Sequence, residues 1–118
     1  MTITLYGIKN CDTMKRARAW LDTHRVDYAF HDYKVAGIDR ATLERWQREV
    51  GLERLLNRSG TTFRKLDESL RASLDEASAL TLMLAQPSMV RRPVLETGAG
   101  ILVGFDPAQY AARLRPPR

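Results

Sequence analysis

Residues 2–6 alternate β-branched residues with others at a period of two, the pattern of a half-buried β-strand. Residues 27–32 form a short segment with aromatic residues, and residues 92–96 and 100–104 contain short apolar runs. The last two flank the segment TGAG, whose glycines favour a tight turn. We therefore predict strands in all these segments and a hairpin formed by the last pair.

Elsewhere the apolar residues recur every three to four positions, which predicts amphipathic helices. The first helix is predicted over residues 11–24, and a short helical piece and a turn are predicted within 52–66. The expected N-terminal caps are Asn10, Asp39, Ser73 with Glu76, and Asp106 with Pro107. The residues predicted to face the core are Met14, Ala17, Leu21, Leu43, Trp46, Val50, Ala77, Leu80 and Leu84. Phe105 is expected to pack against Tyr110 across the last cap.

The predicted order is β-α-β, then a helical block, then β-β-α. A helix between two strands joins a parallel pair, whereas a hairpin adds antiparallel strands. We therefore predict an α/β fold, a thioredoxin-like mixed four-stranded sheet with a helical insertion between strands 2 and 3, over about residues 39–85. The 118 residues suit a single domain, 1–118, with a basic C-terminal tail over about 113–118.

The composition of the chain indicates its partners and its cellular compartment, but not any reaction that it catalyses. The net charge of +5 favours anionic partners, either small acidic substrates or nucleic acid. No apolar run approaches the roughly 20 residues that cross a bilayer, and we expect no secretory signal and no membrane partner. The chain contains one cysteine, so it can form no internal disulfide and suits a reducing compartment, which we expect to be the cytoplasm.

That cysteine, Cys11, lies where the first predicted helix begins. A thiol in the first helical turn is close to unpaired backbone N–H groups and to the positive end of the helix dipole, which favour the reactive thiolate. Lys9, Lys15 and Arg16 add positive charge nearby, and Asp12 opposes them. Position alone is also consistent with an inert, buried cysteine, because free cysteines are among the most buried residues.

A redox C-x-x-C pair is excluded, since Met14 occupies the position three residues after Cys11. Any disulfide that this thiol forms must therefore be mixed, with a small thiol such as glutathione or with a thiol of a partner protein. Without a second cysteine or a cluster of acidic residues, we expect no metal site.

Four segments, TLYGIKNCDTMKRA, LLNRSGTTFRKL, MLAQPSMVRRPVLE and LVGFDP, occur in the order typical of one family. Together they resemble the ArsC/Spx-like family, related to glutaredoxin-coupled arsenate reductases, and are most similar to its YffB-type branch. The resemblance extends over roughly residues 2–114. It implies the same thioredoxin-like fold, a reactive Cys11, no bound cofactor and glutathione as co-substrate.

The resemblance also implies site residues far from Cys11 in the sequence. Pro93 matches the proline that opens the third strand, which is typically cis in this fold and faces the active thiol. Arg92 matches the family arginine that contacts the oxyanion or thiol ligand, and a guanidinium suits such anions. A surface arginine near a strand end is the alternative for Arg92. Lys9 and Asn10, which directly precede Cys11, are also predicted to bind glutathione.

Two further family arginines match this sequence less well. One falls on Asn57 in an ungapped alignment, with Arg58 one residue later; either Arg58 binds the ligand or it is a solvated arginine at a helix end. The other falls on or near Phe105, and no arginine occurs between Arg92 and Arg113. An oxyanion such as arsenate would thus lose a cationic ligand, whereas a glutathione-linked thiol reaction would not.

Two hypotheses about function remain. The first is a glutathione-dependent monothiol oxidoreductase that uses Cys11 as its nucleophile, with doubtful arsenate reduction. The second is a non-enzymatic Spx-like regulator that binds RNA polymerase or another protein. Spx-type switches carry the C-x-x-C that this chain lacks, which favours the enzyme. In either case we expect a monomer without direct contact to nucleic acid.

Overall fold

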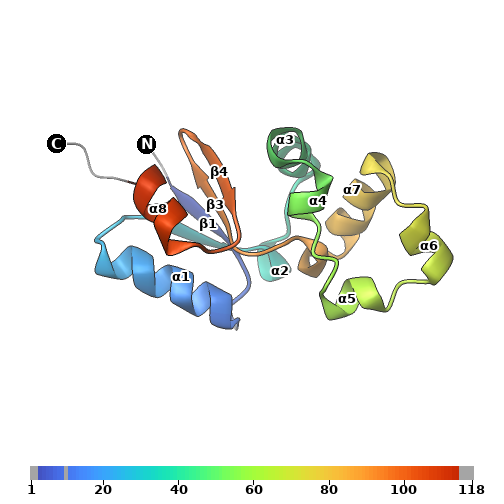
Figure 1. Cartoon of the computed structure of the whole chain (residues 1–118), viewed down its shortest axis with the longest axis horizontal. Helices are drawn as coiled ribbons and strands as arrows, with labels where there is room; N and C mark the ends of the chain where they lie inside the picture. Colours follow the sequence, from blue (N-terminus) through green and yellow to red (C-terminus); the bar gives the residue numbers. More distant parts are fainter. Residues whose placement is uncertain (1–2, 10, 115–118) are drawn as a thin grey trace. The chain divides into compact units, whose positions relative to one another are not determined.

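The computed structural model describes residues 3–9 and 11–114. In this part of the chain, one mixed sheet has the strand order β2-β1-β3-β4 (Figure 1). The strands are β1 (Thr4–Gly7), β2 (Ala29–Asp32), β3 (Val94–Thr97) and β4 (Gly100–Val103). β1 is parallel to β2 and antiparallel to β3, and β3 is antiparallel to β4. The predicted mixed four-stranded sheet and its hairpin are confirmed.

The described residues also form helices. In chain order they are α1 (Asp12–Thr23), α2 (Tyr33–Ala36), α3 (Arg40–Val50), α4 (Leu52–Leu55), α5 (Thr61–Arg64), α6 (Glu68–Ala72), α7 (Glu76–Ala85), the 3-10 turn η1 (Pro87–Met89) and α8 (Pro107–Arg113). The chain forms two compact units. The sheet unit ends at Tyr33, resumes at Arg92 and has the thioredoxin-like β-α-β, β-β-α order, and the helical unit is residues 34–91.

The core of the sheet unit joins α1 and α8 to the strands. Its fully buried members are Leu5, Met14, Ala17, Leu21, Leu95 and Tyr110. Met14, Ala17 and Leu21 are the residues that helical periodicity selected, because they recur on one face of α1. Phe105 packs edge-on against Tyr110 with ring centroids 4.9 Å apart, as expected for the staple that precedes α8.

Gly7 ends β1 where α1 crosses closely. A Cβ atom at this position would overlap the Sδ and Cε atoms of Met14. A residue without a side chain therefore lets Met14 fill the core directly below the strand end. This close packing holds the first turn of α1 beside the carboxyl end of β1.

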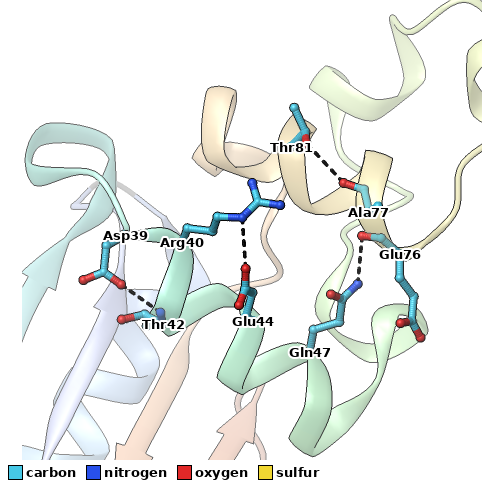
Figure 2. A network of polar contacts seen from close by, with 8 residues as sticks. All are labelled: Asp39, Arg40, Thr42, Glu44, Gln47, Glu76, Ala77 and Thr81. Carbon is cyan, nitrogen blue, oxygen red and sulfur yellow. Dashed lines mark hydrogen bonds and ion pairs between the residues drawn. The ribbon is translucent and has the colours of Figure 1, made fainter.

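The helical unit is organised around α3 and α7. Asp39 caps α3 by accepting a hydrogen bond from the Thr42 amide, 2.8 Å away, and Gly51 ends the helix with a positive φ of 85°. Figure 2 shows this cap and the Gln47 amide group donating to the Glu76 carbonyl of α7, 3.3 Å away. Leu43 and Trp46 are fully buried as predicted, whereas Val50 is half-buried.

The predicted start of α7 is wrong. Ser73 is the C-cap of the short helix α6, which the sequence analysis did not anticipate. The capping box of α7 consists instead of Asp75 and Ser78, whose side chains each bond the other's backbone amide. The buried face of α7 is formed by Ala79, Leu80 and Met83. Of the residues predicted to face the core, Leu80 is therefore buried, whereas Ala77 is exposed and Leu84 is half-buried.

Candidate active site around Cys11

Cys11 is the N-cap of α1, with extended backbone angles. Its side chain is half-buried and packs against the core cluster of the sheet unit. The sequence predicts Asn10 as the N-cap, but in the structure the N-cap is Cys11, one residue later. Asn10 itself lies outside the described residues. A thiol at the N-cap is adjacent to the free amides of the first helical turn.

The surroundings of Cys11 lower the pKa of its thiol below the ordinary value. Burial acts in the opposite direction and raises the pKa, but it is outweighed by the Met14 backbone amide, the Arg92 side chain and the Thr13 amide. No side-chain capping hydrogen bond is formed at this N-cap. The two amides therefore act on the ionised sulfur, because a thiolate accepts hydrogen bonds far more strongly than a thiol.

Arg92 reaches Cys11 because of how the strands pair. Val94 of β3 lies opposite Tyr6 of β1, so the antiparallel β3 begins at the edge of the sheet where β1 ends. Arg92, two residues before Val94, makes a side-chain hydrogen bond with the thiol. The structure thus brings together two residues that the sequence separates by a helix, a strand and the whole helical unit.

Pro93 lies between Arg92 and β3 and is buried. The Arg92–Pro93 peptide bond is cis. The Pro93 carbonyl accepts a hydrogen bond from the Gly104 amide, 2.8 Å away, which joins the start of β3 to the end of β4. The backbone at Pro93 is therefore anchored to the sheet next to the arginine.

Tyr33 is a further residue beside Arg92, and the sequence did not predict it as part of the site. It directly follows β2, is fully buried, and makes a side-chain hydrogen bond with Arg92. Burial raises the pKa of Tyr33 from 10.0 to about 12, although the positive charge of Arg92 acts in the other direction. A tyrosine directly after a predicted parallel strand was the available signal, since such strand ends share one edge of the sheet.

The remaining predicted residues have other surroundings. Lys9 is exposed. In the helical unit, Arg58 is exposed and its guanidinium binds Glu53 through two hydrogen bonds of 2.8 and 3.2 Å. The Asn57 side chain accepts a hydrogen bond from the Ser59 hydroxyl, 3.0 Å away. Phe105 packs on Tyr110, and so contributes an apolar ring where the family resemblance places an arginine.

Buried tyrosines make the fold sensitive to alkaline pH. A folded-state pKa above the unfolded value means that stabilisation is complete below pH 10 and is lost as the pH rises toward 12 for Tyr33. Burial also raises the pKa of Tyr110. Urea unfolding should show the free energy of unfolding falling through this range, by about 2 kcal/mol for Tyr33. Tyr33→Phe should remove that part of the fall; an unchanged slope in this variant would contradict the assignment.

Two kinds of feature are absent from the described residues. None of the helices within residues 3–9 and 11–114 is long and apolar enough to cross a membrane. Over the same ranges, no group of three or more His, Cys, Asp or Glu side chains is placed to hold a metal ion.

Comparison with known proteins yields one family. A model of the ArsC family matches residues 6–113. Among solved structures, the YffB protein is 66% identical, with a TM-score of 0.91 and coverage of 94% of this chain and 97% of the other. An arsenate reductase (ArsC) related protein from Brucella melitensis is 60% identical, with a TM-score of 0.78 and coverage of 98% and 97%. The global transcriptional regulator Spx of Streptococcus pyogenes is 28% identical, over 95% of this chain and 84% of the regulator.

Proposed function

The chain belongs to the ArsC family, and from that premise we propose that it is a glutathione-dependent monothiol oxidoreductase with Cys11 as its nucleophile. The observation that supports this most is the contact of Arg92 with a thiol at the N-cap of α1, where the pKa of the thiol is lowered. A lowered pKa enlarges the fraction of thiolate at neutral pH, and the thiolate is the form that attacks disulfides.

The proposed reaction has two exchange steps. In the first, the Cys11 thiolate attacks the glutathione sulfur of a mixed disulfide, R–S–S–G; the S–S bond breaks, and R–S⁻ leaves and takes a proton. In the second, a glutathione thiolate attacks the new Cys11–S–S–G disulfide and releases the Cys11 thiolate and oxidised glutathione. The net result is R–S–S–G + GSH → R–SH + GSSG: one glutathione thiol is consumed, R–SH is released, and the disulfide bond passes to oxidised glutathione.

The residues around the thiol are suited to an anionic peptide. In the proposal, Arg92 binds a carboxylate of glutathione next to the sulfur, and the backbone at Pro93 contacts the cysteinyl part of the peptide. Lys9 is exposed and adds positive charge before the helix. Glutathione is thus proposed as a co-substrate that binds transiently, and the cytoplasm is the proposed location because a lone thiol stays reduced there.

Arsenate is a less suitable substrate. Its tetrahedral oxyanion needs several positive ligands, and Phe105 places an apolar ring at the position of one family arginine. In the helical unit the guanidinium of Arg58 is already bound by Glu53. We therefore propose that arsenate reduction is weak or absent.

The test is to incubate the protein with oxidised glutathione and to follow its intact mass. We expect one glutathione adduct per chain, formed faster as the pH rises through the pKa of the thiol, and removed by reduced glutathione. A sample whose thiol has been alkylated beforehand serves as the control. Absence of an adduct, or an adduct that reduced glutathione cannot remove, would contradict the proposal. Robust arsenate turnover in a parallel assay would contradict the specificity.

The similarity to Spx over 95% of this chain supports one other candidate, a regulator that binds RNA polymerase or another protein. Backbone NMR with added glutathione separates the two candidates. Shifts centred on Cys11 and Pro93 favour the oxidoreductase, whereas no response there favours the regulator.

A further inference from the structure

The end of β1, the end of β2 and the start of β3 lie at the same edge of the sheet. Gly7, the last residue of β1, is paired with Asp32, the last residue of β2. On the other side of β1, Tyr6 is paired with Val94, the first residue of β3. Tyr33 and Arg92 therefore leave the sheet on either side of the strand that leads to Cys11. This placement follows from strand register alone.

Side-chain contacts connect these segments. The Arg92 side chain makes hydrogen bonds with both the Cys11 thiol and the Tyr33 side chain. Since a guanidinium has donors only, the sulfur and the phenol oxygen act as acceptors in these two contacts. One planar group thus links a fully buried, fixed ring to a half-buried sulfur.

Arginine needs such a link because its side chain is long and flexible. A guanidinium that rotates among several rotamers spends only part of its time against the sulfur. A second acceptor on a buried ring removes that freedom and directs the fork toward the thiol. The ionisable groups that act on the pKa of Tyr33 include Arg92, Cys11 and Asp32. The pKa of the Cys11 thiol is lowered by Arg92 and by the backbone amides of Met14 and Thr13.

We propose that Tyr33 is a positioning residue, whose hydroxyl holds the Arg92 guanidinium against the sulfur of Cys11. The proposal rests on the proposed function, since it assigns Tyr33 a part in activating the same thiol. Tyr33 acts through Arg92 and does not itself take part in the exchange of sulfur atoms. The hydroxyl stays protonated at neutral pH, so it remains a neutral acceptor throughout the reaction.

The test compares Tyr33→Phe with the natural protein through the pH dependence of Cys11 alkylation by iodoacetamide. The variant keeps the buried ring and loses only the acceptor. We expect the pKa of the thiol to rise by about half a unit, which is about a threefold loss of thiolate at neutral pH. The alkylation rate should fall less, by about twofold, because a less acidic thiol gives a more nucleophilic thiolate.

Tyr28→Phe is the matched control. The Tyr28 hydroxyl also accepts a hydrogen bond from an arginine, Arg18, at 3.1 Å. Tyr28 is not among the groups that act most strongly on the pKa of the Cys11 thiol. This variant should leave the pKa of Cys11 unchanged. An equal shift in both phenylalanine variants would show a general loss of packing and would overturn the proposal.

The second comparison uses an Arg92→Ala background. If Tyr33 acts through the guanidinium, Tyr33→Phe should cause no further rise there, whereas an equal rise in both backgrounds would overturn the proposal. Should Tyr33→Phe fail to fold, site-specific incorporation of 3-fluorotyrosine at position 33 weakens the acceptor while keeping the ring, and the pKa should rise in the same direction. These readouts need no glutathione. Failure of the glutathione reaction in the natural protein would refute the proposed function and leave the role of Tyr33 to be judged by the alkylation data.

Discussion

Arg92→Ala is expected to raise the pKa of the Cys11 thiol by about one unit and to weaken glutathione binding about tenfold. Hydrogen bonds to charged groups contribute about 1.5–3 kcal/mol, and partial exposure of Arg92 favours the lower end of that range. The loss removes a direct hydrogen bond to the sulfur together with the nearby positive charge. The amides of Thr13 and Met14 remain, so some lowering of the pKa should persist.

Arg92→Lys is the informative comparison. Lysine keeps the charge but has no planar fork, so it cannot reach two acceptors in the same way. We expect its thiol pKa and its affinity for glutathione to lie between those of the natural protein and of Arg92→Ala. The measurements are the pH profile of alkylation, followed by mass, and a binding titration with reduced glutathione. An unchanged thiol pKa in Arg92→Ala would remove the basis for activation of Cys11 by Arg92.

Trp46→Ala is expected to destabilise the protein by about 3–5 kcal/mol, the usual cost of emptying a large buried aromatic site. Trp46 is fully buried on the inner face of α3, in the unit where this helix packs against α4 and α7. Urea unfolding at neutral pH measures the change in the free energy of unfolding.

Arg48→Ala provides the control for Trp46→Ala. Arg48 belongs to the same helix and is exposed, and alanine is the best helix former, so its replacement should change the stability by less than about 0.5 kcal/mol. A comparable loss in both variants would indicate that helix α3, and not the burial of Trp46, accounts for the effect.

Local pattern was sufficient for much of the fold. Helical spacing identified Met14, Ala17 and Leu21, all fully buried in α1, and Asp39 as the cap of α3. These features depend on residues within one or two turns of each other, so they can be recognised in a short segment. The wrong prediction of Ser73 as the cap of α7 also comes from relying on a short segment. Ser73 and Asp75 are both acceptable caps, and only the presence of α6 decides between them.

The candidate site was likewise only partly predictable from the sequence. The sequence by itself determined that Cys11 lies where a helix begins and that the chain contains no second cysteine to resolve a disulfide. The family resemblance placed Phe105 at or near the position of a family arginine. The family resemblance pointed to Arg92 and Pro93, but not to what Arg92 touches. The registers of β2 and β3 against β1 decided that Tyr33 and Arg92 flank the strand that leads to the thiol. Such pairings join residues far apart in the chain, and their energies depend on the packed sheet as a whole, so no local pattern records them.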